Sequence, residues 1–590
     1  MLKTDTAQAP QSTVMSDQLA QQAVQLAADI LRASRTKETA RERAHIANMA
    51  RMMQDEAGKK FTIVMADQLL KIHQPHRAAQ RLAGMLSQYG IPQYFGWFDR
   101  AAMWTGSLAS RLAPGLVIPA MKQHIRKQAA HVIVSSEPGP FTRYQQWRAS
   151  QGIRINFNQL GEAVLGDREA DRRFLAYLER LQNSDLNYFS VKLSSVVSQI
   201  VMPGYAQTVE LTSSRLRELY RAALHNRTGQ SKFVNLDMEE YRDLHLTVDV
   251  FRKVLDEPEF QALEAGIVLQ AYLPDSYSVQ QELTEWARHR QSRGGAGIKI
   301  RLVKGANLAM EQVEASLRGW EQAPYQSKLE VDANFKRMLE FGTRPENATA
   351  VRLGIASHNL FDIALAILLR RQRGVESRVE FEMLEGMANG QALEVRERTG
   401  GLVIYTPAVP DEEFEAAIAY LVRRLDENTA PGSFLGALFG LQEGSANWNS
   451  QRDAFMQACH LAQSDRLSSR PNRQQNRSTE NPQPLPAGHP FANVPDTDFS
   501  LPVNRQWIEQ IIARCRDLSI APIPLEIGGE IQTREASGIG RDPSRPGIEA
   551  YRYTQATAED VDRALAVAVT AQSNWEELGI AGRARVLRQV

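Results

Sequence analysis

Short β-branched runs alternate with segments long enough for a helix between Gly152 and Pro407. Near-continuous apolar strands in repeated βα units are typical of a parallel sheet covered by helices. We identify these runs as Ile153 to Phe157, Tyr188 to Leu193, Phe233 to Asp237, Ile267 to Ala271, Ile298 to Val303, Leu353 to Ser357, Val379 to Leu384, and Leu402 to Tyr405.

Eight such repeats over about 250 residues favour an α/β fold of the closed (β/α)₈, TIM-type barrel class. The alternative is a doubly wound open sheet. No Gly-x-Gly-x-x-Gly follows any of the runs, which counts against a Rossmann nucleotide site.

The chain has 590 residues, a 43% apolar fraction and a net charge of +1. This length favours several domains, and the charge balance gives no field that would attract nucleic acid, so we predict no nucleic-acid partner. Only two cysteines are present, Cys459 and Cys515, which argues against a disulfide framework and favours the cytoplasm. Contact with the inner face of the cell membrane and homo-oligomerisation are left open.

Composition divides the chain into five predicted parts. Residues 1–14 are a polar tail, and 15–130 are helical, with apolar spacing that begins at Ala20, Ala23, Val24, Ala27, Ile30 and Leu31. The barrel takes 131–445. Residues 446–490 hold a helix and a polar linker, and 491–590 form a separate C-terminal piece.

Polar side chains stand at the end of nearly every predicted strand, where a barrel carries its active site. Seven decorated ends that converge on one mouth indicate a ligand site rather than a solvated rim. They are Lys192, Asp237, Gln270 with Tyr272, Arg301 with Lys304, Ser357 with His358 and Asn359, Glu382 with Glu385, and Tyr405.

Individual residues leave alternatives open. Lys192 near Asp237 is either a neutral base or a buried ion pair, and His358 is either a hydrogen-bond donor or an acid–base group. Gly305 and Ala306 after Lys304 permit close backbone approach to a flat or anionic ligand. In His73-Gln-Pro-His76 the proline would break a helix that aligned the two rings, so we predict no metal.

The segment from Tyr420 to Asn428 reads as a helix with two adjacent arginines. Its apolar stripe leaves Tyr420, Arg423, Arg424 and Glu427 on the opposite face. Two guanidinium forks suit a small carboxylate ligand, whereas a solvated face with a weak Arg424–Glu427 pair is the plainer alternative.

These motifs together resemble the proline dehydrogenase barrel, in the form found in bacterial proline utilization A. The likeness covers roughly residues 60 to 445. It rests on Phe189-Ser-Val-Lys192, Val234-Asn-Leu-Asp237, Gln270-Ala-Tyr272, Arg301-Leu-Val-Lys-Gly-Ala306, Ala356-Ser-His-Asn359, Leu384 with Gly386-Met387, and Tyr420-Leu-Val-Arg-Arg-Leu425.

The resemblance implies an FAD-dependent oxidation of L-proline to Δ1-pyrroline-5-carboxylate, with electrons passed to a membrane quinone. This is the first step of proline degradation to glutamate. Such chemistry requires the reacting carbon stacked on the flavin, an uncharged amine and excluded water.

Carried over by motif, the resemblance also implies roles for individual residues. Arg423 and Arg424 would grip the proline carboxylate, and Glu162 would pair with Arg423 as a gate. The remaining pocket residues would be Lys192, Asp237, Leu384, Tyr405 and Tyr420. The flavin contacts would be Asp237, Met238, Gln270, Arg301, Val303, Gly305, Ala306, Lys328, Ser357, His358 and Glu427.

Two positions depart from the family pattern. Asn307 stands where a tyrosine usually follows Lys-Gly-Ala, so an aromatic wall near the flavin is lost, and Asn158 replaces an aspartate four residues before Glu162. The family's DNA-binding members carry a basic N-terminal strand that residues 1–50 lack, so we predict no transcriptional role.

The C-terminal piece resembles the opening of an aldehyde dehydrogenase domain, from Pro524-Leu-Glu-Ile-Gly-Gly-Glu530 through Trp575. In proline utilization A that domain oxidises glutamate semialdehyde with NAD. The chain stops at Val590 inside an amphipathic helix, so we expect an incomplete domain without that active site.

Two other functions remain as alternatives. A lysine-dependent, Schiff-base aldolase could use Lys192 or Lys304 at a barrel strand end. A non-catalytic carboxylate-binding protein would bind proline without flavin.

Overall fold

The computed structural model describes residues 16–129, 133–160, 164, 166–415, 417–418, 434–438, 441–480, 493–516, 520–532 and 534–589. The chain divides into two compact units, Met1–Arg505 and Gln506–Val590. The helical region, the barrel and the segment after it belong to the first unit, so the division lies beyond the predicted boundary at 491.

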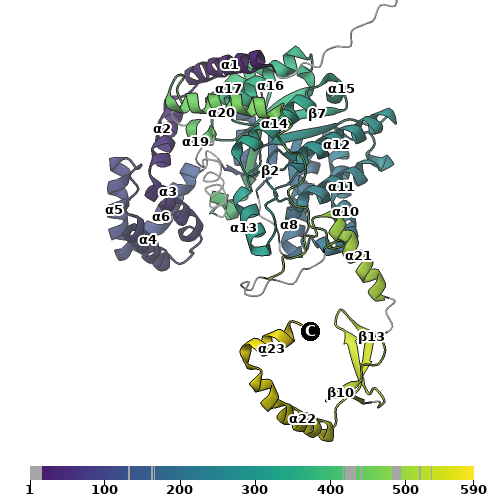
Figure 1. The fold of residues 1–590 in the computed structure, drawn as a ribbon. Coiled ribbons are helices and arrows are strands. Elements are labelled where there is room, and N and C mark those ends of the chain that lie inside the picture. Colours follow the sequence, from purple (N-terminus) through teal and green to yellow (C-terminus); the bar gives the residue numbers. More distant parts are fainter. Residues whose placement is uncertain are drawn as a thin grey trace, which may run out of the picture. The chain divides into compact units, whose positions relative to one another are not determined.

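A closed parallel barrel forms the centre of the first unit (Figure 1). Each strand pairs in parallel with the next, and β9 pairs with both β8 and β2, which closes the ring. The predicted (β/α)₈ class is therefore confirmed, and the open sheet was wrong. The strands are β2 (Ile153–Gln159), β3 (Tyr188–Lys192), β4 (Phe233–Asp237), β5 (Gly266–Gln270), β6 (Ile298–Val303), β7 (Val351–Ala356), β8 (Val379–Leu384) and β9 (Leu402–Val409).

Strand boundaries differ from the prediction mainly at β9. The sequence placed its end at Tyr405, but the strand continues to Val409 because Ala408 and Val409 pair with a short additional strand, β1 (Val134–Ser135). β1 was not predicted, since two residues carry no periodicity. Tyr405 is therefore inside a strand, opposite Leu384 of β8, rather than at its end.

Helices cover the outside of the barrel between successive strands (Figure 1). Their inner faces are apolar, as in Val250, Phe251 and Val254, all fully buried. The helices are α7 (Pro138–Ser150), α8 (Asp167–Asn183), α9 (Leu193–Val196), α10 (Tyr205–Leu224), α11 (Asp243–Leu255), α12 (Asp275–Ser292), α13 (Leu308–Arg318), α14 (Lys328–Gly342), α15 (Pro345–Ala348), α16 (Leu360–Gln372) and α17 (Asn389–Thr399), with 3₁₀ turns at Met202–Gly204, Pro258–Phe260, Glu376–Arg378 and Asp411–Glu413.

The N-terminal region is helical, as predicted. Ser16 caps α1, and Ala23, Ala27 and Ile30 are fully buried where α1 packs against α16 and α17. The helices are α1 (Asp17–Thr36), α2 (Ala40–Gln54), α3 (Glu56–Val64), a π-helical turn (Met65–Leu69), α4 (Pro75–Tyr89), α5 (Trp97–Leu112) and α6 (Pro114–Ala129). Pro75 begins α4 rather than interrupting a helix, and His73 lies before it.

After the barrel come α19 (Phe434–Leu438) and α20 (Ala446–Ala462), and α20 packs on α14. Part of the predicted linker also packs against the barrel unit. Arg473 is 3% exposed at its side chain and forms ion pairs with Glu311 and Asp498, at 3.4 and 3.3 Å. Asn472 also donates to the backbone oxygens of Ala323 and Pro324, so several contacts fix a segment whose composition is that of a linker.

The second unit contains two antiparallel strand pairs and two helices. The strands are β10 (Leu525–Ile527) with β11 (Glu530–Gln532), and β12 (Gly538–Asp542) with β13 (Arg545–Tyr553). The helices are α22 (Ala558–Glu577) and α23 (Gly579–Leu587), and α21 (Pro502–Arg516) crosses the boundary between units. Several large apolar side chains of this unit are exposed, including Val569 and Ile580.

Candidate functional site

A cluster of Asp237, Arg301 and Tyr405 lies in the barrel near the C-terminal ends of the strands. Asp237 and Arg301 are buried, and Tyr405 is half-buried. Arg301 donates from Nη2 to Asp237 Oδ1 at 2.8 Å, and the Tyr405 hydroxyl donates to Asp237 Oδ2 at 3.0 Å. The guanidinium also lies over the Tyr405 ring, 4.8 Å from its centroid. Three strands, β4, β6 and β9, thus supply one charged and aromatic surface.

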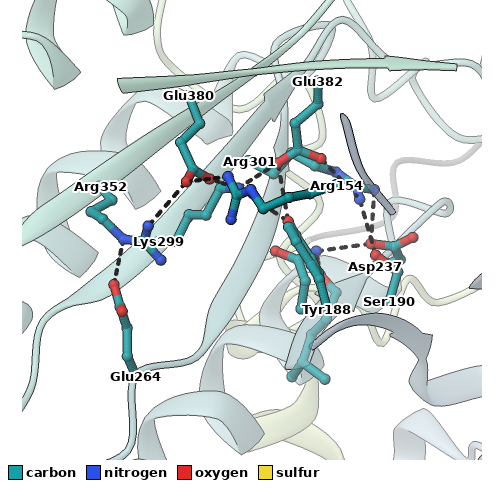
Figure 2. A network of polar contacts seen from close by, with 12 residues as sticks. Arg154, Tyr188, Ser190, Asp237, Glu264, Lys299, Arg301, Arg352, Glu380 and Glu382 are labelled. Carbon is teal, nitrogen blue, oxygen red and sulfur yellow. Dashed lines mark hydrogen bonds and ion pairs between the residues drawn. The ribbon is translucent and has the colours of Figure 1, made fainter. Parts of the chain in front are cut away.

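Arg301 is held in a fixed orientation at this position. Its Nη1 donates to Ser190 Oγ at 3.0 Å and lies 3.8 Å from Glu382 Oε2 (Figure 2). Burial opposes the positive charge, but the carboxylates of Asp237 and Glu382 outweigh it and raise the pKa of Arg301 above its usual value. The arginine is therefore a permanent cation inside the barrel.

Lys192 pairs with a residue that the sequence reading missed. Its Nζ lies 2.7 Å from Glu239 Oε2, although Lys192 and Asp237 are register partners on β3 and β4. The carboxylate of Asp237 is oriented instead by Arg301, Tyr405 and Asn235, whose Nδ2 donates to it at 2.9 Å. Lys192 is thus adjacent to Asp237 in the sheet, but it forms its ion pair with Glu239.

Glu239 connects Lys192 to the predicted cofactor residues. Its backbone oxygen accepts hydrogen bonds from Gln270 Nε2 and from the Tyr272 hydroxyl, each at 3.1 Å. In the loop after β4, the family motifs assign only Met238 to the cofactor site, and Met238 is buried. A period-two strand pattern has no signal for a loop residue of this kind.

Gly305 lies against an aromatic ring beyond the end of β6. Its φ is +116°, and a Cβ there would lie 2.5 Å from the Tyr272 ring. Both the backbone conformation and the ring therefore require glycine. Val303 ends β6, Ala306 follows Gly305, and Asn307 is the N-cap position of α13.

His358 accepts a hydrogen bond from the backbone at the end of β8. Its Nε2 accepts from the Leu384 backbone N–H at 2.9 Å, which places the ring proton on Nδ1. Among the described residues, this buried Nδ1 has no partner. Burial lowers the pKa of His358 from 6.5 to about 4, so the ring is a neutral donor at neutral pH. Ser357 accepts from the Asn359 N–H at 3.0 Å and so shapes the same turn.

Lys304 and Lys328 share the carboxylate of Asp332 near the start of α14. Lys304 Nζ lies 2.5 Å from Asp332 Oδ1 and 2.8 Å from Asp362 Oδ2, and Lys328 pairs with Asp332 Oδ2. Burial opposes the charge of Lys304, but the two carboxylates raise its pKa. The pKa of Lys328 is lowered by burial and by Lys304. Lys328 is the more exposed of these cations and can meet an anionic group.

Five predicted site residues lie outside the described residues: Glu162, Tyr420, Arg423, Arg424 and Glu427. Their predicted contacts with the carboxylate and the flavin therefore stay predictions. Within the described ranges, no group of three or more His, Cys, Asp or Glu could hold a metal ion. None of the helices described there is long and apolar enough to cross a bilayer.

The residues at the barrel mouth fit a large, flat and polar cofactor such as FAD. Gln270 Oε1, Arg301 Nε and His358 Nδ1, all on predicted cofactor residues, are among the buried polar atoms that lack hydrogen-bond partners in the described part of the chain. Buried polar atoms of this kind are normally satisfied, so they point to a ligand with both donors and acceptors. Gly305 adds a backbone surface without a side chain.

Other polar contacts at this end of the barrel were not predicted. Arg148 of α7 donates from Nε to Glu385 at 2.9 Å and from Nη1 to Asn389 at 2.8 Å, and its guanidinium lies 4.0 Å from the Trp147 ring centroid. Both Arg148 and Glu385 are buried. This pair joins α7 to the turn after β8, next to Leu384.

We expect His358 to make stability depend on pH. Because the folded pKa is lowered, the unfolded chain binds the proton more readily, so stability present above pH 6.5 is lost as the pH falls towards 4. Between pH 7 and pH 5 this amounts to about 2 kcal/mol. His358→Gln should show a correspondingly smaller loss in urea unfolding, whereas the exposed His289→Gln should behave as wild type. Equal losses in both variants would contradict the assignment.

Comparisons with known proteins agree with this architecture. A model of the proline dehydrogenase family matches residues 142–437. The bifunctional protein PutA of Escherichia coli K12 is 28% identical over 307 residues, which cover 49% of this chain and 22% of that protein. Hydroxyproline dehydrogenase of Bos taurus is 27% identical over 230 residues, or 38% of this chain and 48% of the relative.

Solved structures give the same result. PutA from Corynebacterium freiburgense is 40% identical with a TM-score of 0.58, covering 68% of this chain and 38% of the other. PutA from Bdellovibrio bacteriovorus inactivated by N-propargylglycine is 25% identical with a TM-score of 0.74, and the match covers 94% of this chain and 55% of the other. The chain thus spans only part of its relatives' length. The family match over half of the sequence and the barrel that carries it show that the chain belongs to the proline dehydrogenase family, a family of FAD-dependent oxidoreductases of proline catabolism.

Proposed function

We propose that this chain oxidises L-proline to Δ1-pyrroline-5-carboxylate with FAD, and that the electrons pass on to a quinone. The observation that carries the proposal is the Asp237–Arg301–Tyr405 cluster, which lies inside the family match and beside unsatisfied buried polar atoms. The reaction is the first step in the degradation of proline to glutamate.

FAD, when bound, supplies the redox chemistry by accepting two electrons from the substrate. The chain's own residues bind and orient. Arg301 offers a fixed positive charge where negative charge develops, and Gln270 and His358 offer an acceptor and a donor. Gly305, Ala306, Val303, Met238 and Ser357 would border the cofactor, Lys328 would meet its phosphates, and Glu427 is a further proposed contact.

The substrate would be held by its carboxylate and by its ring. Arg423 and Arg424 would bind the carboxylate bidentately, and Glu162 would close over it through Arg423. Lys192, Leu384, Tyr405 and Tyr420 would enclose the ring, with the Tyr405 hydroxyl fixed by Asp237. Asn307 in place of an aromatic residue leaves more room at this wall.

Lysine pairing argues against the aldolase alternative. A Schiff-base lysine must lose its proton at neutral pH, but two carboxylates raise the pKa of Lys304. Lys192 is likewise engaged at 2.7 Å by Glu239. A protein that binds only a small carboxylate would offer no partners to Gln270 Oε1, Arg301 Nε and His358 Nδ1, whereas a flavin carries both donors and acceptors.

The rest of the chain suggests a role within a larger protein. We infer that residues 491–590 are the opening segment of an aldehyde dehydrogenase domain, since relatives of greater length are bifunctional proteins. NAD-linked oxidation of glutamate semialdehyde would belong to that whole protein. A quinone acceptor would require peripheral contact with the inner face of the membrane from a cytoplasmic location.

The visible spectrum of the purified protein tests the proposed activity. We expect flavin absorbance that bleaches when L-proline is added without oxygen, because the substrate reduces the bound cofactor. Dithionite should bleach the same bands and confirms that the chromophore is a flavin. A colourless protein that binds proline, or a flavin that dithionite bleaches and proline does not, would contradict the proposal. Trapping of a substrate adduct on lysine with borohydride would favour the aldolase.

A further inference from the structure

A chain of ion pairs fills the interior of the barrel below the candidate site (Figure 2). It begins at the amino-terminal ends of the strands, where Glu380 pairs with Arg154 at 2.6 Å and with Arg352 at 3.2 Å. Glu264 holds Arg352 at 2.5 Å. This end is partly open to solvent, since the Arg154 side chain is 59% exposed.

The middle of this series of ion pairs is fully buried. Lys299 Nζ lies between two carboxylates, 2.7 Å from Glu380 Oε2 and 2.6 Å from Glu382 Oε1, and its side chain is 0% exposed. Tyr188 donates from its hydroxyl to Glu382 at 3.0 Å and accepts from Lys299 at 3.2 Å. Burial opposes the ammonium charge, but Glu382 and Glu380 raise the pKa of Lys299, so it stays protonated.

A glycine makes room for this pair. A Cβ on Gly354 of β7 would lie 2.6 Å from Lys299 Cε and 2.7 Å from Glu382 Oε1. Gly354 stands opposite Arg301 on β6 and Glu380 on β8, so its missing side chain leaves the space that the pair occupies. Buried charges are expensive, and a barrel core of apolar side chains would be at least as stable. The pair therefore calls for an explanation beyond stability.

The other end of this series of ion pairs, at Glu382 and Arg301, reaches the candidate site. The second oxygen of Glu382, Oε2, lies 3.8 Å from Arg301 Nη1, and Arg301 binds Asp237. Without Lys299, Arg301 would face two carboxylates, Asp237 and Glu382, and the three groups would have a net charge of −1. Lys299 neutralises Glu382, so the four buried groups Lys299, Glu382, Arg301 and Asp237 sum to zero.

We propose that Lys299 and Glu382 are positioning residues that set the charge which Arg301 presents at the barrel mouth, and through it the reduction potential of the bound flavin. The inference rests on the proposed function, because it presumes that FAD binds beside Arg301. Reduction adds negative charge to the flavin, so a more positive surrounding raises its potential and a more negative one lowers it. Both residues are buried in the barrel interior and are not among the proposed substrate contacts.

Two single variants should move the potential in opposite directions. Glu382→Gln leaves a net charge of +1 in the buried group and keeps the hydrogen bonds to Lys299 and Tyr188. Equilibration with a reference dye should show the reduced flavin favoured about tenfold over wild type. This corresponds to a reduction potential raised by about 30 mV for a two-electron couple. Lys299→Met leaves a net charge of −1 and should disfavour reduction about tenfold. The double variant restores neutrality and should return to within about threefold of wild type.

Glu380→Gln is the matched control. Glu380 also contacts Lys299 at 2.7 Å, but its carboxylate also meets Arg154 and Arg352, and it makes no contact with Arg301. We expect its dye equilibrium to stay within about threefold of wild type. If Lys299→Met does not hold flavin, Glu382→Gln and the double variant carry the test by themselves.

The outcomes separate this inference from the proposed function. Flavin-loaded variants whose potentials are unchanged, or shift in the same direction, would overturn the positioning role even if proline still reduces the wild type. A wild type whose flavin proline does not reduce would overturn the proposed substrate, whereas opposite shifts in the dye equilibrium would still support the pair. Wild-type protein without flavin would overturn both.

Discussion

Replacing Arg301 with leucine is expected to lower the free energy of unfolding of the barrel by about 3–5 kcal/mol. The substitution leaves Asp237 and Glu382 buried without their shared cation, and it empties the space above the Tyr405 ring. Proline oxidation should be lost at the same time, because the fixed charge at the mouth is gone. The shift of the urea midpoint of the barrel transition measures the first effect, and flavin content with turnover measures the second.

Arg154→Leu provides the comparison for this variant. Arg154 pairs with Glu380 at 2.6 Å, but its side chain is 59% exposed, so solvent screens the interaction and about 0.5 kcal/mol or less should be lost. Arg301→Lys should fold better than the leucine variant while losing the two-pronged contact to Ser190 and Asp237. Equal losses for Arg154→Leu and Arg301→Leu would contradict a special role for the buried arginine.

Arg148→Met is expected to lower the free energy of unfolding by a similar amount, about 3–5 kcal/mol, for a different reason. Arg148 and Glu385 are 2% and 4% exposed at their side chains, and Arg148 binds Glu385, Asn389 and Gln151. Methionine fills much of the volume but leaves Glu385 charged and buried. Because Glu385 follows Leu384, the turn at the pocket wall should loosen, and the KM for proline should rise with the fall in the urea midpoint.

A second substitution distinguishes charge from packing here. Glu385→Gln in the Arg148→Met background removes the unpaired carboxylate, so the double variant should be more stable than Arg148→Met alone. Tyr144 and Thr406 remain as partners in the network around that side chain, since Tyr144 contacts both residue 385 and the Thr406 hydroxyl. A double variant that is less stable than the single one would show that lost packing dominates.

The barrel could be predicted because its strands are buried on both faces. Ile298, Ile300 and Leu302 face the helices and are fully buried, so the run reads as a strand whatever lies inside the barrel. The interior was harder to predict, although a signal was present. Lys299 and Arg301 on β6, and Glu380 and Glu382 on β8, repeat with a period of two, which marks one polar face directed inward.

The site was predictable only where a strand end carries the residue. Asp237 ends β4 and Arg301 lies near the end of β6, as the strand prediction placed them, and their contact follows from parallel strands ending together. Glu239 was missed because a loop residue has no periodicity in the sequence. It forms the ion pair with Lys192 for which Asp237 had been considered. Arg148 was missed because its partner Glu385 is far away in the sequence, and only packing brings the two together.

The closure of the ring fixes an order of events for a growing chain. β2 completes its pairing only with β9, the last barrel strand to be made, and the carboxylates of β8 that pair with Lys299 also follow β6 in the sequence. Until β8 is present, a partial barrel would hold the buried Lys299 without its counterions, which is unfavourable, whereas Arg301 already has Asp237 of β4. Folding should therefore be delayed until nearly the whole barrel is synthesised, and polypeptides that end before Glu382 should remain targets for chaperones and proteases.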